Sequence, residues 1–215
     1  MKDFAGEFET HLTVEWTSMA GEEGRIRRWA ERHRVKYTRI VLDRGATLDQ
    51  PMLTVRGHGV LQTQRKAALA WIERLCAEGF SVARVKIEAA PWNEDVPRTP
   101  AEAQQLPLGC YFEHHVKLVL TDEAQLAAVR ALAEQHTAHM SRNARRDLGR
   151  CGHERFVTQR CRGVSRSEAR RRLDALLDAL ATAGFKAVEV EEEFVVHDDR
   201  PALDSGWIYE KTDVR

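Results

Sequence analysis

Two Glu-x-His pairs stand at equivalent places in two similar stretches of the chain. FETHLTV at residues 8–14 carries Glu9 and His11, and FEHHVKL at residues 112–118 carries Glu113 and His115. Each stretch alternates apolar and polar residues like a half-buried strand, so the Glu and His of each pair share one face. A histidine beside a carboxylate titrates near or above neutral pH, which suits proton transfer. We therefore interpret these four residues as candidate catalytic groups, with a histidine as general acid or base.

Basic and hydroxyl side chains recur around the two pairs at matching positions. LTVRGHG at residues 53–59 aligns with VTQRCRG at residues 157–163. Paired arginines suit bidentate contact with a phosphate or carboxylate group. We therefore expect a small anionic substrate, held by residues from both stretches: Arg56, Arg160, Lys117, Lys86, Thr54, Thr158, Arg39 and Arg142.

Two other interpretations of these residues stay open. Imidazole and carboxylate ligands suit Fe, Mn, Ni or Zn, so Glu9, His11, Glu113 and His115 are an alternative set for one divalent metal ion. Arg56 and Arg160 on the same face would oppose such a cation. In the third interpretation the chain is a non-catalytic interaction protein whose polar sheet faces are solvated, as one face of an antiparallel sheet commonly is. The substrate, the reaction and the cofactor are not fixed by the sequence.

The four residues HLTV resemble the His-hydrophobic-Thr-hydrophobic motif of the two-histidine phosphoesterases. Those enzymes are likewise bilobal, with one motif in each lobe, and the resemblance implies action on cyclic or 2′-5′ nucleotide phosphates. The second copy here is HVKL, in which Lys117 stands where that family has Thr or Ser. The first motif also lies on the opening strand, whereas the family usually reaches it after a strand and a helix. The part that persists in both copies is Glu-x-His.

The elements that must position these residues are themselves repeated. A shift of 104 residues superimposes the two Glu-x-His stretches, and a shift of 103 pairs AERH at 30–33 with AEQH at 133–136. A shift of 105 pairs Gly79-Phe80 with Gly184-Phe185. Offsets that drift by one residue are what small loop insertions produce, so the pattern indicates duplication and fusion.

Each half shows the same order of elements. In the first half, alternation and β-branched residues predict four strands, at 7–16, 36–42, 51–56 and 81–89. Apolar residues at helical spacing predict two helices, at 20–34 and 62–79. The order β-α-β-β-α-β is the ferredoxin-like unit, and the second half repeats it with its long helix at 165–183. We predict an α+β fold with two antiparallel sheets, helices on their outer faces, a pseudo-twofold axis, and a cleft where the two open faces meet.

The domain organisation follows from the repeat. Residues 91–108 carry four of the six prolines among polar residues, which indicates a linker. We therefore expect one ferredoxin-like half at 1–90, the Pro-rich linker at 91–108 and a second half at 109–215.

Composition narrows the class of partner. Lys plus Arg and Asp plus Glu both number 33 among 215 residues, so no net charge favours nucleic acid or an acidic membrane. One block, between Arg142 and Arg172, holds eleven arginines against three acidic residues, but it lacks the aromatic residues of a stacking platform. No window approaches the ~20 apolar residues of a membrane span. We expect a cytoplasmic protein with a small-molecule ligand and four reduced cysteines; the oligomeric state is open.

Overall fold

The computed structural model describes residues 2–15, 21–144 and 152–208. The first half of the chain forms β1 (Gly6–Val14), α1 (Glu22–His33), β2 (Lys36–Leu42), β3 (Asp49–Gly59), α2 (Leu61–Ala77) and β4 (Val82–Ala89). A short helix, α3 (Pro100–Gln104), follows. The second half forms β5 (Tyr111–Leu120), α4 (Glu123–Gln135), β6 (Ala138–Asn143), β7 (His153–Arg162), α5 (Arg166–Thr182), β8 (Glu189–Asp198) and the 3₁₀ helix η2 (Pro201–Asp204). The prediction of an α+β fold built from two ferredoxin-like units is confirmed.

The two predicted sheets are joined into one. All eight strands form a closed antiparallel barrel in the order β1-β3-β2-β6-β7-β5-β8-β4. The joins lie between β2 and β6, where Ile40 faces Asn143, and between β4 and β8, where Lys86 faces Asp198. The expectation of two separate sheets was wrong because each sheet has two edge strands with unpaired backbone N–H and C=O groups, and each edge pairs with an edge of the other half.

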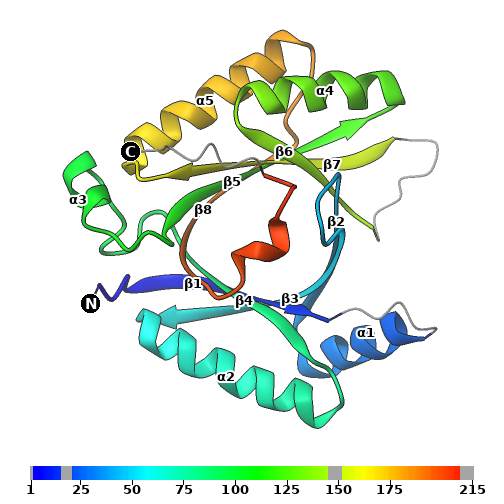
Figure 1. Cartoon of the computed structure of the whole chain (residues 1–215), viewed down its shortest axis with the longest axis vertical. Helices are drawn as coiled ribbons and strands as arrows, with labels where there is room; N and C mark the ends of the chain where they lie inside the picture. The colour runs from blue at the N-terminus through cyan, green and yellow to red at the C-terminus, as the bar shows by residue number, and fades with distance from the viewer. Residues whose placement is uncertain (1, 16–20, 145–151, 209–215) are drawn as a thin grey trace.

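The helices cover the outside of the barrel in two layers, α1 and α2 on one side and α4 and α5 on the other (Figure 1). Beneath α4 and α5 lies a core that includes Val116, Val157 and Leu173, and beneath α1 and α2 lies a core that includes Leu12 and Trp29. Leu12 and Val116 therefore point outward from β1 and β5 toward the helices. Because side chains alternate along a strand, the neighbouring Glu and His residues point into the barrel.

Matching residues end the long helices of the two halves. Gly79 follows α2 with a φ of 78°, and Gly184 follows α5 with a φ of 85°. This left-handed conformation costs any other residue about 1–2 kcal/mol, so glycine stops both helices at the same point of the repeat. The chain then enters β4 at Val82 and β8 at Glu189, which pair with β1 and β5 respectively.

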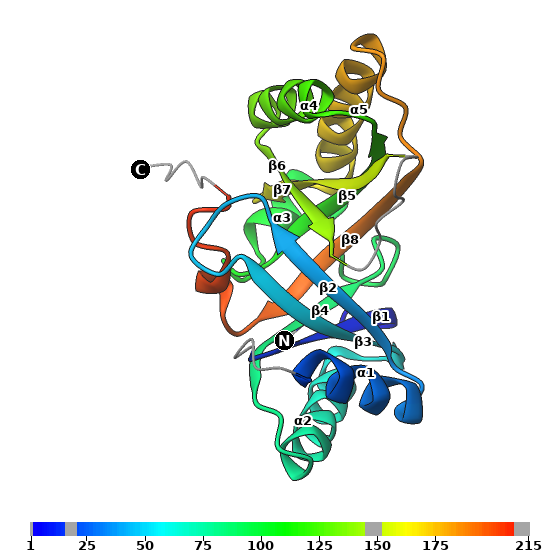
Figure 2. The ribbon, with the colours of Figure 1, turned by 90° about the vertical axis from the view of Figure 1, so that its right-hand side faces the viewer.

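Residues 201–207, here called the C-terminal plug, lie across one end of the barrel (Figures 1 and 2). Asp204 is buried and accepts hydrogen bonds from Arg84 Nη1 at 2.9 Å and Arg160 Nη2 at 2.7 Å. Gln50 Nε2 donates to the other Asp204 oxygen at 3.1 Å, and Trp207 Nε1 donates to the Met140 carbonyl at 2.8 Å. The plug therefore closes this end by polar contacts with both halves.

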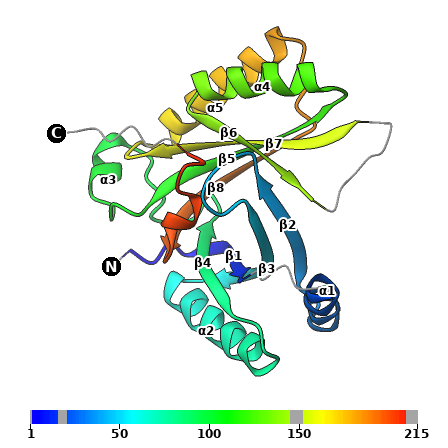
Figure 3. The same ribbon diagram turned by 45° about the vertical axis from the view of Figure 1, so that its right-hand side comes forward.

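The segment 91–108, predicted as a linker, includes α3 (Figure 3). The side chains of Val96 and Ala103 in this segment are buried. Of the cysteines, Cys76, Cys110 and Cys161 are free thiols, and Cys151 lies outside the described residues. Arg145, Arg146 and Arg150 of the basic block also lie outside them. None of the described helices has the length and apolar character needed to cross a membrane.

Candidate functional site

The inward faces of the eight strands line a cavity of about 230 Å³ inside the barrel. One wall carries the polar residues of β1, β4, β5 and β8, including His11, His115 and Glu193. The opposite wall carries apolar side chains from β2, β3 and β7, including Ile40 and Met52. The two open faces that the sequence predicted to oppose each other do so, as the walls of a barrel rather than of a cleft between separate sheets.

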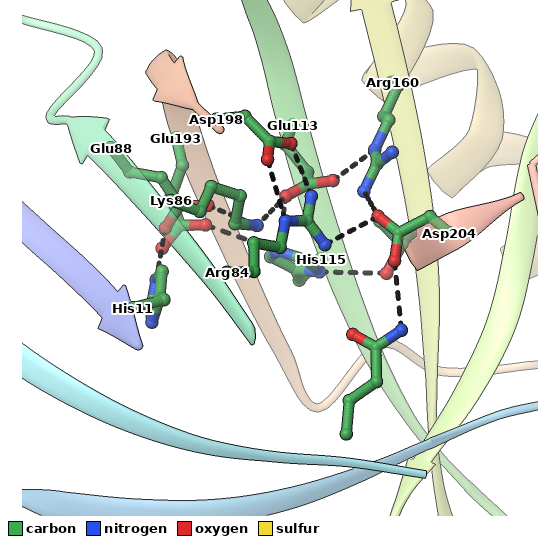
Figure 4. A network of polar contacts seen from close by, with 12 residues as sticks. His11, Arg84, Lys86, Glu88, Glu113, His115, Arg160, Glu193, Asp198 and Asp204 are labelled. Carbon is green, nitrogen blue, oxygen red and sulfur yellow. Dashed lines mark hydrogen bonds and ion pairs between the residues drawn. The ribbon is translucent and has the colours of Figure 1, made fainter. Parts of the chain in front are cut away.

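His11 is held by partners on both ring nitrogens. Its Nε2 donates to Glu88 Oε2 at 2.5 Å (Figure 4). Its Nδ1 lies 2.9 Å from Thr54 Oγ1. Burial lowers the pKa of this imidazole, but the charge and hydrogen bond of Glu88 outweigh burial and raise the pKa above its usual value. The carboxylate of Glu88 has a correspondingly lowered pKa, because the opposing charges of His11 and Lys86 outweigh its burial. His11 and Glu88 therefore form a buried ion pair.

His115 repeats this arrangement in the second half. Its Nδ1 lies 2.9 Å from Thr158 Oγ1, and its Nε2 lies 3.3 Å from Glu193 Oε2 and 3.7 Å from Glu113 Oε2. Burial opposes the imidazolium, but the bonds to the two carboxylates outweigh it and raise the pKa of His115 to about 10. Each half thus contributes a Thr–His–carboxylate set, and a shift of 105 residues relates Glu88 to Glu193.

Glu193 differs from the other carboxylates of the site. Burial and the nearby charge of Glu88 raise its pKa to about 7. Its carboxyl oxygen lies close to the ring nitrogens of both histidines, since Glu9, His11 and Glu193 form one compact ligand set and Glu113, His115 and Glu193 form another. Near neutral pH this carboxyl is both a donor and an acceptor of protons, which is the condition for general acid and base chemistry.

Glu113 is the fully buried centre of the charge network. Its two oxygens accept from Lys86 Nζ and Arg160 Nε, both at 2.5 Å. These cations outweigh the effect of burial and hold the pKa of Glu113 well below its usual range. Lys86 also contacts Glu88 at 2.6 Å, so it links the sets of the two halves. The network is a charge-balanced structure in which no cation of this group is left for a ligand.

The predicted site residues divide into three groups. Glu9, His11, Thr54, Lys86, Glu113, His115, Lys117, Arg142, Thr158 and Arg160 all line the cavity. Arg56 lies at the rim with 82% of its side chain exposed, where it donates to Glu9. Arg39 points away from the cavity, because its neighbours Thr38 and Ile40 point in, and it pairs with Asp49 and Glu23. Arg39 is therefore not part of the cavity lining, and its role in substrate binding stays a prediction.

Several residues of the buried charge network were not included in the predicted site. Glu88 and Glu193 were placed on the inner face but not in the site, although a shift of 105 residues relates them and marks them as partners of the two histidines. Arg84 and Asp204 were missed as well, because nothing in the local sequence shows that residues 201–207 fold back into the barrel. The four residues proposed as one metal set do not converge on one point: among the described residues they belong to two sets that share Glu193.

Stability should fall as the pH rises from about 6.5 toward 10. The ordinary pKa of histidine is 6.5, and the pKa of His115 in the folded protein is about 10. The contacts of the protonated His115 with its carboxylates therefore stabilise the fold fully below pH 6.5, and this stabilisation is lost as the pH approaches 10. Glu193 acts in the same direction between pH 4.5 and about 7, because the folded state keeps a proton that the unfolded chain releases. Urea denaturation at intervals across this range measures the decline.

The variant His115→Gln should flatten the decline above pH 6.5. His58→Gln, at an exposed position of β3, is the matched control and should leave the profile unchanged. A profile for His115→Gln that coincides with that of the parent would contradict the assignment.

No protein-family model matches the chain, and no curated protein matches it either. Among solved structures, the acetolactate synthase small subunit from Thermotoga maritima is 14% identical, with 89% of this chain and 96% of that chain covered and a TM-score of 0.34. A heme-binding protein from Thermus thermophilus is 11% identical, with 89% and 90% covered and a TM-score of 0.30. Chlorite dismutase from Candidatus Nitrospira defluvii, in complex with imidazole, is 10% identical, with 91% and 92% covered and a TM-score of 0.29. Likenesses at this level carry no argument about the site.

Proposed function

We propose that the barrel interior binds a small organic acid and that Glu193, together with His115, exchanges a proton with it. The observation that carries the proposal is the position of Glu193, whose carboxyl lies 3.3 Å from His115 on the wall of the cavity and has a pKa of about 7. A general acid or base works best when its pKa is near the working pH. Both an enzyme and a binding protein with a proton-coupled ligand would use this group.

The lining of the cavity supports an amphipathic ligand. Ile40, Met52 and Phe156 line one side and would contact an apolar body. The buried cations pair with carboxylates of the chain, so they do not supply the site for an anionic group. Lys36 and Arg142 also line the cavity, are exposed, and form no ion pair with another described residue. The acid group is therefore best accommodated by these two side chains.

Blocking the cavity should abolish the binding of a small carboxylate such as benzoate. Thr38 lines the cavity, and Thr38→Phe would place a ring in the space where an apolar body would lie. Thr63→Phe makes the same change on the exposed face of α2 and is the matched control. An NMR titration of the labelled protein with benzoate measures both. Equal affinity of the parent and Thr38→Phe would rule out the barrel interior as the site.

Glu193→Gln separates proton exchange from binding alone. In the parent, benzoate affinity should change between pH 6 and 8 as Glu193 titrates, and in Glu193→Gln this part of the pH dependence should disappear. Binding with the same pH profile in both proteins would retain the ligand site and remove Glu193 from the chemistry.

A second candidate function is a divalent metal centre at Glu113, His115 and Glu193. One ligand atom from each of these residues lies within 4.8 Å of the others, and His115 keeps Nε2 directed at the two carboxylates while Nδ1 lies beside Thr158. Such a donor set suits Mn, Fe or Zn. The contacts of Lys86 and Arg160 with Glu113 oppose a further cation and make this candidate the weaker one. Metal analysis of protein purified without an affinity tag distinguishes the two candidates.

A further inference from the structure

A second concave site lies outside the barrel, where the end of α1 meets α2 and β3. It is a groove of about 480 Å³, within the range of small-molecule sites. Four of the described residues that line it are basic, namely His33, Arg34, Lys36 and Arg56, and none of them is acidic. In a chain with no net charge this is a local concentration of positive charge. The groove adjoins the mouth of the cavity, because Lys36 and Thr54 line both.

The cations of the groove are available to a ligand, unlike the buried cations Lys86, Arg84 and Arg160 inside the barrel. Arg34 and Lys36 are exposed, and neither forms an ion pair with another residue in the described part of the chain. Arg56 contacts Glu9 through Nε, and 82% of its side chain is exposed. A guanidinium of this kind presents its remaining N–H groups in the fork that matches the oxygens of a phosphate.

The apolar part of the groove is a fixed aromatic cluster. Trp71 lines the groove beside Val35 and Val55, and its ring meets that of Trp29 edge-on at 6.0 Å. His33 stacks on Trp29 at 4.2 Å and donates from Nδ1 to the Trp29 carbonyl at 3.0 Å. Since a carbonyl only accepts, Nδ1 carries the proton of this hydrogen bond. These contacts hold the imidazole and the indole in place before any ligand arrives.

The second half keeps the backbone of this region without its chemistry. Arg34 has a φ of 56°, and Thr137, its counterpart by the shift of 103, has a φ of 52°. The same shift relates Lys36 to His139, and the shift of 105 relates Trp71 to Leu176. The left-handed backbone therefore belongs to the repeated unit, whereas the free cations and the indole belong to the first half alone.

We infer that this groove binds a small organic phosphate, with the phosphate between Arg34 and Arg56 and an apolar group against Trp71. The groove adjoins the acid-binding cavity of the proposed function and shares Lys36 and Thr54 with it, but Arg34, Arg56 and Trp71 line the groove alone. Charge-assisted bonds to a phosphate contribute about 1.5–3 kcal/mol each, so the loss of one arginine should weaken binding about tenfold or more.

Phenyl phosphate is the probe ligand. Inorganic phosphate measures the binding of the anionic group alone, and phenol measures the binding of the apolar group alone. In an NMR titration of the labelled protein, phenyl phosphate should bind more tightly than either. Arg34→Gly removes the cation at a position whose left-handed backbone suits glycine. This variant should lower the affinity for phenyl phosphate about tenfold. Thr137→Gly makes the equivalent backbone change in the second half and should leave the affinity unchanged.

Two further variants separate this site from the cavity. Trp71→Leu introduces the residue type of Leu176, the equivalent position in the second half. It should remove the preference for phenyl phosphate over inorganic phosphate. Thr38→Phe, which blocks the cavity, should leave phenyl phosphate binding intact. The inference would be overturned by unchanged affinity in Arg34→Gly, by loss of binding in Thr38→Phe, or by binding of a single-stranded oligonucleotide without binding of phenyl phosphate.

Discussion

Glu113→Gln is expected to lower the free energy of unfolding by about 3–5 kcal/mol, because it removes one partner of a buried ion network. Glu113 is fully buried, and its oxygens accept from Lys86 and Arg160 at 2.5 Å. The amide of Gln keeps the shape but has no charge, so two buried cations lose a shared anion. Urea denaturation at pH 7 measures the change as a lower midpoint with an unchanged slope.

The repeat supplies the control for this prediction. Glu9 is the counterpart of Glu113, and it pairs with Arg56 at 2.8 Å as Glu113 pairs with Arg160. Because 82% of the Arg56 side chain is exposed, Glu9→Gln should cost at most about 1 kcal/mol. A similar loss of stability in both variants would mean that burial does not determine how much the ion pairs contribute to the free energy of unfolding.

Asp204→Ala is expected to destabilise the protein by about 3 kcal/mol and to detach the C-terminal plug. Asp204 bridges Arg84 of β4 and Arg160 of β7, so its removal leaves two buried guanidinium groups with one carboxylate partner each. This loss lies at the lower end of the range for a broken buried pair because Asp198 and Glu113 remain in place. The measurement is again urea denaturation.

Asp178→Ala is the matched control for Asp204→Ala. Asp178 is exposed on α5, so its loss should change stability by less than about 0.5 kcal/mol. Millimolar acetate should restore part of the stability of Asp204→Ala, since it can occupy the space between the two arginines. A variant as stable as the parent would show that the plug is held by Trp207 and its backbone contacts rather than by charge.

The fold was predictable because the repeat doubled every local signal. Alternation in FETHLTV and FEHHVKL placed Glu9 and Glu113 on the inner face, and the helical spacing of apolar residues placed the helices on the outer face. The closure of the barrel was not predictable. Pairing of β2 with β6 and of β4 with β8 joins residues about a hundred positions apart, and nothing within either strand specifies the partner of its free edge.

The sequence predicted which residues of the candidate site point into the barrel, because this depends only on the alternation of side chains along a strand. The face of His115 follows from alternation, but its pairing with Glu193 depends on the register of β5 against β8. Arg160 was predicted to hold a substrate, and in the structure it pairs with Glu113 and with Asp204, which comes from a segment that follows the last strand. Charge type can be read from sequence, whereas the neutralisation of a charge by a distant residue cannot.

The way in which the barrel closes also sets the order in which it can fold. The β2–β6 join aligns only the three pairs from Ile40↔Asn143 to Leu42↔Ser141, whereas β5 and β7 of one half align along their full length. Contacts within a half are the more local ones, and they form at a smaller loss of chain entropy. The buried charges come from both halves, so they leave water only when the halves meet. The slow event of folding would then be the joint dehydration of these charges, not the formation of any strand or helix.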